Sequence, residues 1–131
     1  MASSSFRTDY NRVAGLGSAR EGAGHWWAQR LTAIALIPLS IAFVFLFGST
    51  LGEGREAAIE TFGHPLAALT AILFIAVGFS HLQLGLRIVI EDYVHGRKLA
   101  FTLLILNVLL CWGLAAVGVF SVARIAFGYA G

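Results

Sequence analysis

Three residue types are scarce in this 131-residue chain: it has one cysteine, one methionine and two prolines. The lone Cys111 excludes an intrachain disulfide framework and a cysteine-ligated iron–sulfur cluster. A glycine-rich dinucleotide fingerprint, a Walker loop and a nucleophile elbow are also missing, so dinucleotide and hydrolase chemistry have no sequence motif. The net charge is +2 and the isoelectric point is near 9.1, but the absence of a basic run argues against nucleic-acid binding.

Charged residues are scarce as well, at 12% of the chain, whereas 58% are hydrophobic and the mean hydropathy is +0.81. No Asp, Glu, Lys or Arg occurs in the windows 31–52, 61–86 and 99–123, which hold 22, 26 and 25 residues. Roughly 20 apolar residues suffice for a helix to cross the hydrocarbon core. We therefore expect an all-α integral membrane protein with spans at about 31–51, 65–91 and 99–123. These spans form a single domain, 25–131, after a polar N-terminal segment, 1–24.

The positive charges predict an orientation in the membrane. Arginines precede the first span and Arg97 and Lys98 follow the second, whereas Arg55 and Arg124 lie toward the opposite side. The positive-inside rule places the N-terminus and the turn after Tyr93 in the cytoplasm, or in the equivalent organellar matrix, and the C-terminus on the other side. We expect a multi-pass protein of the bacterial inner membrane or the mitochondrial inner membrane, in which the first span directs insertion.

The residues before the first span allow two interpretations. Trp26 and Trp27 suit an interfacial aromatic belt. Arg30 either extends to the lipid headgroups or places a positive charge next to an anionic cofactor group just inside the membrane.

Other polar and bulky residues give expectations about packing. Pro38 predicts a kink in the first span, and the glutamate-rich residues 52–63 are expected to form a loop. Asn107 is costly in lipid, so we expect it to make an interhelical hydrogen bond. Trp112 lies too deep for an interfacial belt, so we expect it to pack against a helix.

The stretch 81–93, H-L-Q-L-G-L-R-I-V-I-E-D-Y, is the most informative part of the sequence. On a helix Gly85 and Asp92 share a face with His81, and Tyr93 lies roughly 18 Å from it along the axis. One helix thus carries an imidazole in the apolar interior and an Asp-Tyr pair at the membrane surface. This pattern suits a buried redox cofactor with a polar reaction site at the end of the same helix.

His81 itself has two interpretations. Ionisable residues within a span are functional candidates, although a histidine can simply form a hydrogen bond between helices. Gly78 and Gly85 either leave a niche for a flat porphyrin or mark an ordinary helix contact. The other histidines lie at membrane boundaries, so a low-spin haem at His81 would need its second ligand from another subunit.

At this point the residues resemble a known family. The pattern His81-x3-Gly85-x6-Asp92-Tyr93-Val94, preceded by His25 and by R-L-T-A at residues 30–33, is similar to the small hydrophobic anchor subunit of succinate dehydrogenase, respiratory complex II. The resemblance covers about residue 17 to the end of the third span, including the three-helix plan. In the first fifteen or so residues we find no match that can be used, and we recognise no motif in the third span.

The resemblance implies specific roles. His81 would be one axial ligand of a haem b shared with the partner cytochrome subunit, and Arg30 would neutralise a haem propionate. Tyr93 would donate a hydrogen bond to a ubiquinone carbonyl, with Asp92 in support. The chain would dock the flavoprotein and iron–sulfur subunits and form part of the ubiquinone reduction site, without oxidising succinate itself.

Two other functions remain open at this level. A fumarate reductase anchor runs similar electron transfer in the opposite net direction. A cofactor-free structural anchor would use His81 for helix packing and Tyr93 as an interfacial aromatic. A proton-conducting transporter is disfavoured, because the spans contain no chain of Asp or Glu residues.

Overall fold

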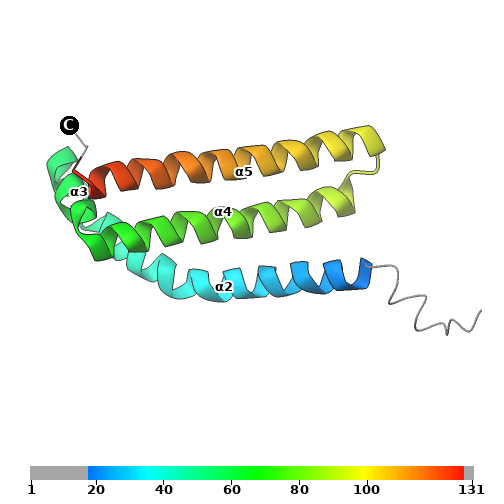
Figure 1. The fold of residues 1–131 in the computed structure, drawn as a ribbon, viewed down its shortest axis with the longest axis horizontal. Coiled ribbons are helices and arrows are strands. Elements are labelled where there is room, and N and C mark those ends of the chain that lie inside the picture. The colour runs from blue at the N-terminus through cyan, green and yellow to red at the C-terminus, as the bar shows by residue number, and fades with distance from the viewer. Residues whose placement is uncertain (1–17, 129–131) are drawn as a thin grey trace, which may run out of the picture.

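The computed structural model describes residues 18–128, and within them it contains helices and no strands (Figure 1). The elements are α2 (Ser18–Gly48), α3 (Gly54–Gly63), α4 (Pro65–Tyr93) and α5 (Arg97–Ala126). The helices α2, α4 and α5 are each long and apolar enough to cross a membrane. The prediction of an all-α protein with three transmembrane helices is therefore confirmed.

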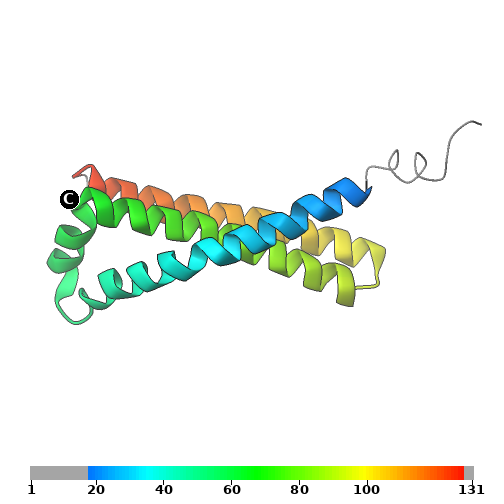
Figure 2. The same ribbon diagram turned by 90° about the horizontal axis from the view of Figure 1, so that it is seen from below.

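The three long helices lie side by side, with α4 between α2 and α5 and antiparallel to both (Figure 1). The start of α2, the end of α4 and the start of α5 share one end of the bundle, which we call the Arg97 end. At the opposite end α3 connects α2 to α4 and contacts both α4 and α5. In the view turned by 90°, α2 crosses α4 obliquely (Figure 2). The most apolar window of α2 has no residue buried by the rest of the chain.

The helices extend beyond the spans expected from charge scarcity, except that α2 ends three residues before the expected end of the first span. α2 begins at Ser18, inside the segment 1–24 expected to be polar, and ends at Gly48. α4 continues to Tyr93, and α5 runs from Arg97 to Ala126. A charge-free window marks the part of a helix that lies in hydrocarbon. The helix itself continues into polar residues until a breaker or a turn ends it.

The expectation of a loop at 52–63 is wrong for most of its length, because Gly54–Gly63 form α3. Gly52 and Gly54 have φ values of 84° and 89°, a region that favours glycine, and they allow the chain to turn into this helix. Phe62 is buried beside Ala67 and Ala71 of α4. The glutamates lie on the solvated face of a short amphipathic helix. They led to the expectation of a loop, although the helix also has an apolar face.

Aromatic rings pack against one another at the α3 end of the bundle. The ring of Phe43 on α2 is stacked on Phe74 of α4, with centroids 4.4 Å apart. It also lies 5.7 Å from Phe47 and 6.3 Å from Phe62 of α3. Such aromatic pairs contribute beyond their buried area. The α3 end therefore holds the helices together, and the polar side chains that join α2 to α4 lie nearer the other end.

The expectations for the interior of the spans had different outcomes. Buried Asn107 donates a hydrogen bond from Nδ2 to the carbonyl oxygen of Gln83 at 3.0 Å, which confirms the predicted link between helices. Trp112 was expected to pack against a helix; it is 52% exposed among the described residues, so that prediction would need a helix of another subunit. Helix α2 continues through Pro38, and its axis bends in its second half in Figure 1.

Gly118 lets α5 approach α4 closely, which gives a test of the packing. A Cβ at Gly118 would lie 3.1 Å from Cγ2 of Ile75, whereas a Cβ at Gly113 would meet nothing within 4 Å. Small residues at such contacts let transmembrane helices pack by van der Waals attraction. We expect Gly118→Val to destabilise the protein by about 1–3 kcal/mol. The control Gly113→Val should have little effect.

Thermal unfolding in detergent measures this difference directly. Gly118→Val should unfold at a lower temperature than the parent protein, and Gly113→Val should unfold with it. Equal unfolding temperatures for the two variants would show that the α4–α5 contact does not depend on the missing side chain.

Candidate functional site

His81 lies half-buried on α4 and faces α2. Its Nδ1 is 3.0 Å from Oγ1 of Thr32. The same Thr32 oxygen lies 2.8 Å from the carbonyl oxygen of Ala28 and 3.1 Å from that of Gln29. We call the contact between these helices the α2–α4 seam; it includes the pair Thr32–His81 and the neighbouring Gln29–Gly85 contact. The histidine singled out from the sequence is therefore a seam residue with a defined hydrogen-bond partner.

The two glycines near His81 face the same seam. A Cβ at Gly85 would lie 3.6 Å from Nε2 of Gln29, and one at Gly78 would lie 3.9 Å from Cδ2 of Leu36. Side chains of α2 therefore occupy the space beside both glycines. Within this chain the glycines serve a helix contact, and this observation disfavours a porphyrin niche directly above them.

A cavity of about 430 Å³, which we call the seam cavity, opens between α2 and α4 toward the Arg97 end. Its walls combine apolar residues with two arginines and one glutamate. The lining residues are Gly22, His25, Trp26, Gln29 and Arg30 of α2, and Leu84, Arg87, Ile88 and Glu91 of α4. Leu84 lies one helical turn beyond His81, so the cavity begins close to the histidine. Its excess of positive charge suits an anionic group.

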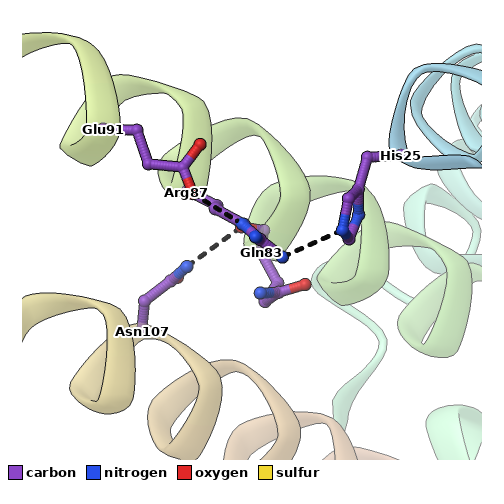
Figure 3. Close-up of polar contacts among 5 residues, drawn as sticks. All are labelled: His25, Gln83, Arg87, Glu91 and Asn107. Carbon is purple, nitrogen blue, oxygen red and sulfur yellow. Dashed lines mark hydrogen bonds and ion pairs between the residues drawn. The ribbon is translucent and has the colours of Figure 1, made fainter. Parts of the chain in front are cut away.

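Arg87 links the two walls of the seam cavity. Its Nε donates to Oε1 of Glu91 at 2.8 Å, four residues further along α4. Its Nη1 donates to Nε2 of His25 on α2 at 3.0 Å (Figure 3). A guanidinium group has only donors, so this contact requires an unprotonated Nε2 on His25. Figure 3 shows Arg87 between these two partners, with Asn107 approaching Gln83 one turn away.

Arg30 and Gln29 supply further polar groups to the seam cavity. The guanidinium carbon of Arg30 lies 5.3 Å from the ring centroid of Trp26, a cation–π contact that holds the exposed side chain beside the cavity. The buried Oε1 of Gln29 has no hydrogen-bond partner among the described residues. A buried acceptor without a partner is costly, so a donor there would stabilise the site.

Tyr93 and Asp92 lie in the last turn of α4, outside the lining of the seam cavity. Tyr93 is 79% exposed, and Asp92 is exposed as well. Across residues 18–128 neither side chain forms a hydrogen bond or an ion pair. Of the four residues predicted to form sites, the structure therefore brings His81 and Arg30 to one seam, and it leaves Tyr93 and Asp92 accessible at the end of the same helix.

Thr32, Gln29 and Arg87 are site residues to which the sequence assigned no role. Thr32 stands within the R-L-T-A pattern at residues 30–33, but which side chain its hydroxyl contacts depends on how α2 is aligned with α4. Periodicity within one helix gives the face of a residue and says nothing about its partner on another helix. No signal in one sequence could have found these pairings.

Comparisons with known proteins place this chain in a family. The model of the succinate dehydrogenase/fumarate reductase transmembrane subunit matches residues 4–120. The succinate dehydrogenase hydrophobic membrane anchor subunit of Paracoccus denitrificans is 39% identical over 92% of this chain and 93% of its own length. That of Rickettsia bellii (strain RML369-C) is 30% identical over 76% and 80%, and the succinate dehydrogenase membrane anchor subunit of Reclinomonas americana is 32% identical over 60% and 68%.

No solved structure matches the chain. The family match, the relatives and the three apolar helices agree with the resemblance carried by residues 81–94. The chain belongs to the succinate dehydrogenase/fumarate reductase transmembrane subunit family, as a hydrophobic membrane anchor subunit of succinate dehydrogenase.

Proposed function

We propose that this anchor subunit docks the flavoprotein and iron–sulfur subunits of succinate dehydrogenase to the membrane. It shares a b-type haem with a partner cytochrome subunit and forms part of the ubiquinone reduction site. In this role it takes part in electron transfer from succinate to quinone, in the tricarboxylic acid cycle and the respiratory chain. The observation that carries the proposal is a positively charged cavity beginning one helical turn from a histidine within a membrane span.

The residues present fit a haem. His81 offers an imidazole in an apolar helix, and the seam cavity offers Arg30 and Arg87 to anionic propionates. Hydrogen bonds from arginine to a carboxylate are among the stronger ones available in a protein. The second axial ligand would come from the partner subunit.

When bound, the haem would supply a one-electron carrier, and the residues of this chain would hold and tune it. Arg30, fixed over Trp26, places a positive charge at the mouth of the seam cavity, and this charge favours the reduced state of a nearby group. The charge of Arg87 is partly compensated by Glu91 at 2.8 Å. Arg30 is therefore the main cation available to an anionic group, in agreement with the role that the family resemblance implies.

The quinone site would use the exposed end of α4. The exposed Tyr93 has no hydrogen-bond partner among the described residues, so its hydroxyl can donate to a quinone carbonyl oxygen as negative charge develops there. Asp92 precedes it and would orient or support that donor. A carboxylate beside a developing anion is unfavourable unless it is paired, so a cation from a neighbouring subunit is expected at Asp92 in the complex.

Two alternatives retain specific support. The matching family model covers fumarate reductase subunits as well as succinate dehydrogenase subunits, and the direction of electron flow depends on the quinone and the soluble subunits. A cofactor-free anchor is favoured by the close approach of α2 side chains to Gly78 and Gly85.

Purification of the complex through a tag on this chain tests the proposal. The flavoprotein and iron–sulfur subunits should co-purify, together with succinate-to-quinone activity. A reduced-minus-oxidised optical spectrum should contain a b-type haem band. Full activity without that band would leave the cofactor-free anchor, and recovery of the chain without the catalytic subunits would contradict docking.

A further inference from the structure

The hydrogen-bond contacts of Thr32 point to a role for this residue beyond anchoring. Its Oγ1 lies within hydrogen-bond distance of three atoms: Nδ1 of His81 at 3.0 Å, and the carbonyl oxygens of Ala28 at 2.8 Å and Gln29 at 3.1 Å. A threonine hydroxyl has one proton to donate and two lone pairs to accept with. The three neighbours therefore compete for one proton, and their chemistry decides which receives it.

The two carbonyl oxygens can only accept, whereas Nδ1 of a histidine can donate or accept. If the hydroxyl proton went to Nδ1, the 2.8 Å contact with the oxygen of Ala28 would bring two lone-pair oxygens together without a hydrogen between them. If the proton goes to the carbonyls of α2, the hydroxyl is left as an acceptor. In that arrangement every close contact of Thr32 contains a hydrogen bond.

We propose that Thr32 is a positioning residue that holds the proton of His81 on Nδ1 and so leaves the lone pair on Nε2 for iron. The inference rests on the haem ligation proposed above. The hydrogen bond made by one imidazole nitrogen determines which nitrogen binds a metal, and it fixes the plane of the ring. Helix α2 thereby contributes to the iron site through a backbone-anchored hydroxyl, without touching the iron.

Three variants separate this role from packing. Thr32→Val keeps the branched shape and removes the hydroxyl, whereas Thr32→Ser keeps the hydroxyl and removes the methyl group. Thr70→Val is the matched control, because Oγ1 of Thr70 bonds only to the carbonyl oxygen of Leu66 in its own helix. Each variant is purified as the full complex. Its haem midpoint potential and its rate of haem loss to an excess of apomyoglobin are then measured.

A hydrogen bond from the second ring nitrogen makes an imidazole a more basic ligand, which stabilises oxidised iron. We therefore expect Thr32→Val to raise the midpoint potential and to speed haem loss by roughly tenfold or more. Thr32→Ser and Thr70→Val should resemble the parent complex in both measurements. An unchanged potential and rate in Thr32→Val, or equal shifts in Thr32→Val and Thr32→Ser, would overturn the proposal.

The yield of assembled complex is measured as well, so that the test remains decisive if a variant does not fold. A residue that acts only through His81 cannot be more important for assembly of the complex than His81 itself. If Thr32→Val and Thr32→Ala both fail to assemble while His81→Leu assembles, Thr32 is a structural residue and the proposal is wrong. If the parent complex contains no haem, the ligation proposed for His81 fails first, which distinguishes that failure from a failure of the role of Thr32.

Discussion

Replacing His81 by leucine should remove the b-type haem from the purified complex. Leucine has a volume similar to that of histidine and no lone pair, so it deletes the imidazole that we propose as the iron ligand, while the seam stays filled. Thr32 keeps its two carbonyl partners and loses only one contact. We therefore expect assembly to survive in part and the haem band to disappear or weaken strongly in a reduced-minus-oxidised spectrum.

His64→Leu is the matched control for this change. His64 is exposed at the junction between α3 and α4, and its backbone caps the start of α4. The substitution removes an imidazole from the boundary of the bundle without touching the seam, so the haem content should equal that of the parent complex. A normal low-spin haem spectrum in His81→Leu would refute the assignment of His81 as a ligand.

Tyr93→Phe should impair electron transfer from succinate to quinone by roughly tenfold or more. The substitution keeps the aromatic ring at the end of α4 and removes the exposed hydroxyl donor. A hydrogen bond that is stronger to the reduced quinone than to quinone acts on turnover, at a cost on the order of 1–3 kcal/mol. Assembly and haem content should stay near normal, because no described residue depends on that hydroxyl.

Two activities measured on one preparation separate the possible causes. Succinate oxidation with an artificial soluble acceptor reports on the docked catalytic subunits, and quinone reduction reports on the site at Tyr93. We expect the first activity to be preserved and the second to fall. An equal loss of both would indicate failed docking, and a loss of neither would identify Tyr93 as an interfacial aromatic.

The sequence predicted the spans because hydrocarbon excludes charge so strongly that three charge-free windows reveal three helices. It also predicted the link made by Asn107, since an amide in lipid needs a partner. It missed α3, because at ten residues this helix is too short for a strong periodic signal and its glutamates resemble those of a loop. For Trp112 the sequence could not say which helix it packs against, because depth along a helix does not determine which side faces the neighbours; the residue is exposed within this chain.

For the candidate site as well, the sequence predicted some features and missed others. His81 and Arg30 could be singled out, because ionisable groups in or beside an apolar helix are costly unless they are used. Their partners could not be found. The Thr32–His81 and His25–Arg87 contacts each join residues of two different helices, and they depend on the crossing and relative shift of α2 and α4. Those quantities follow from packing and are not encoded in the period of either helix alone.

The exposure of α2 within this chain has a consequence for the steady-state amount of this protein in the cell. In its most apolar window the rest of the chain buries no residue. In the proposed complex we expect helices of other subunits to cover this face. Binding to the folded state stabilises a protein by an amount that grows with the logarithm of the free concentration of its partner. Anchor synthesised in excess of those partners therefore remains poorly stabilised and open to proteolysis. Its abundance should follow the supply of the partner subunits and change little with its own gene dosage.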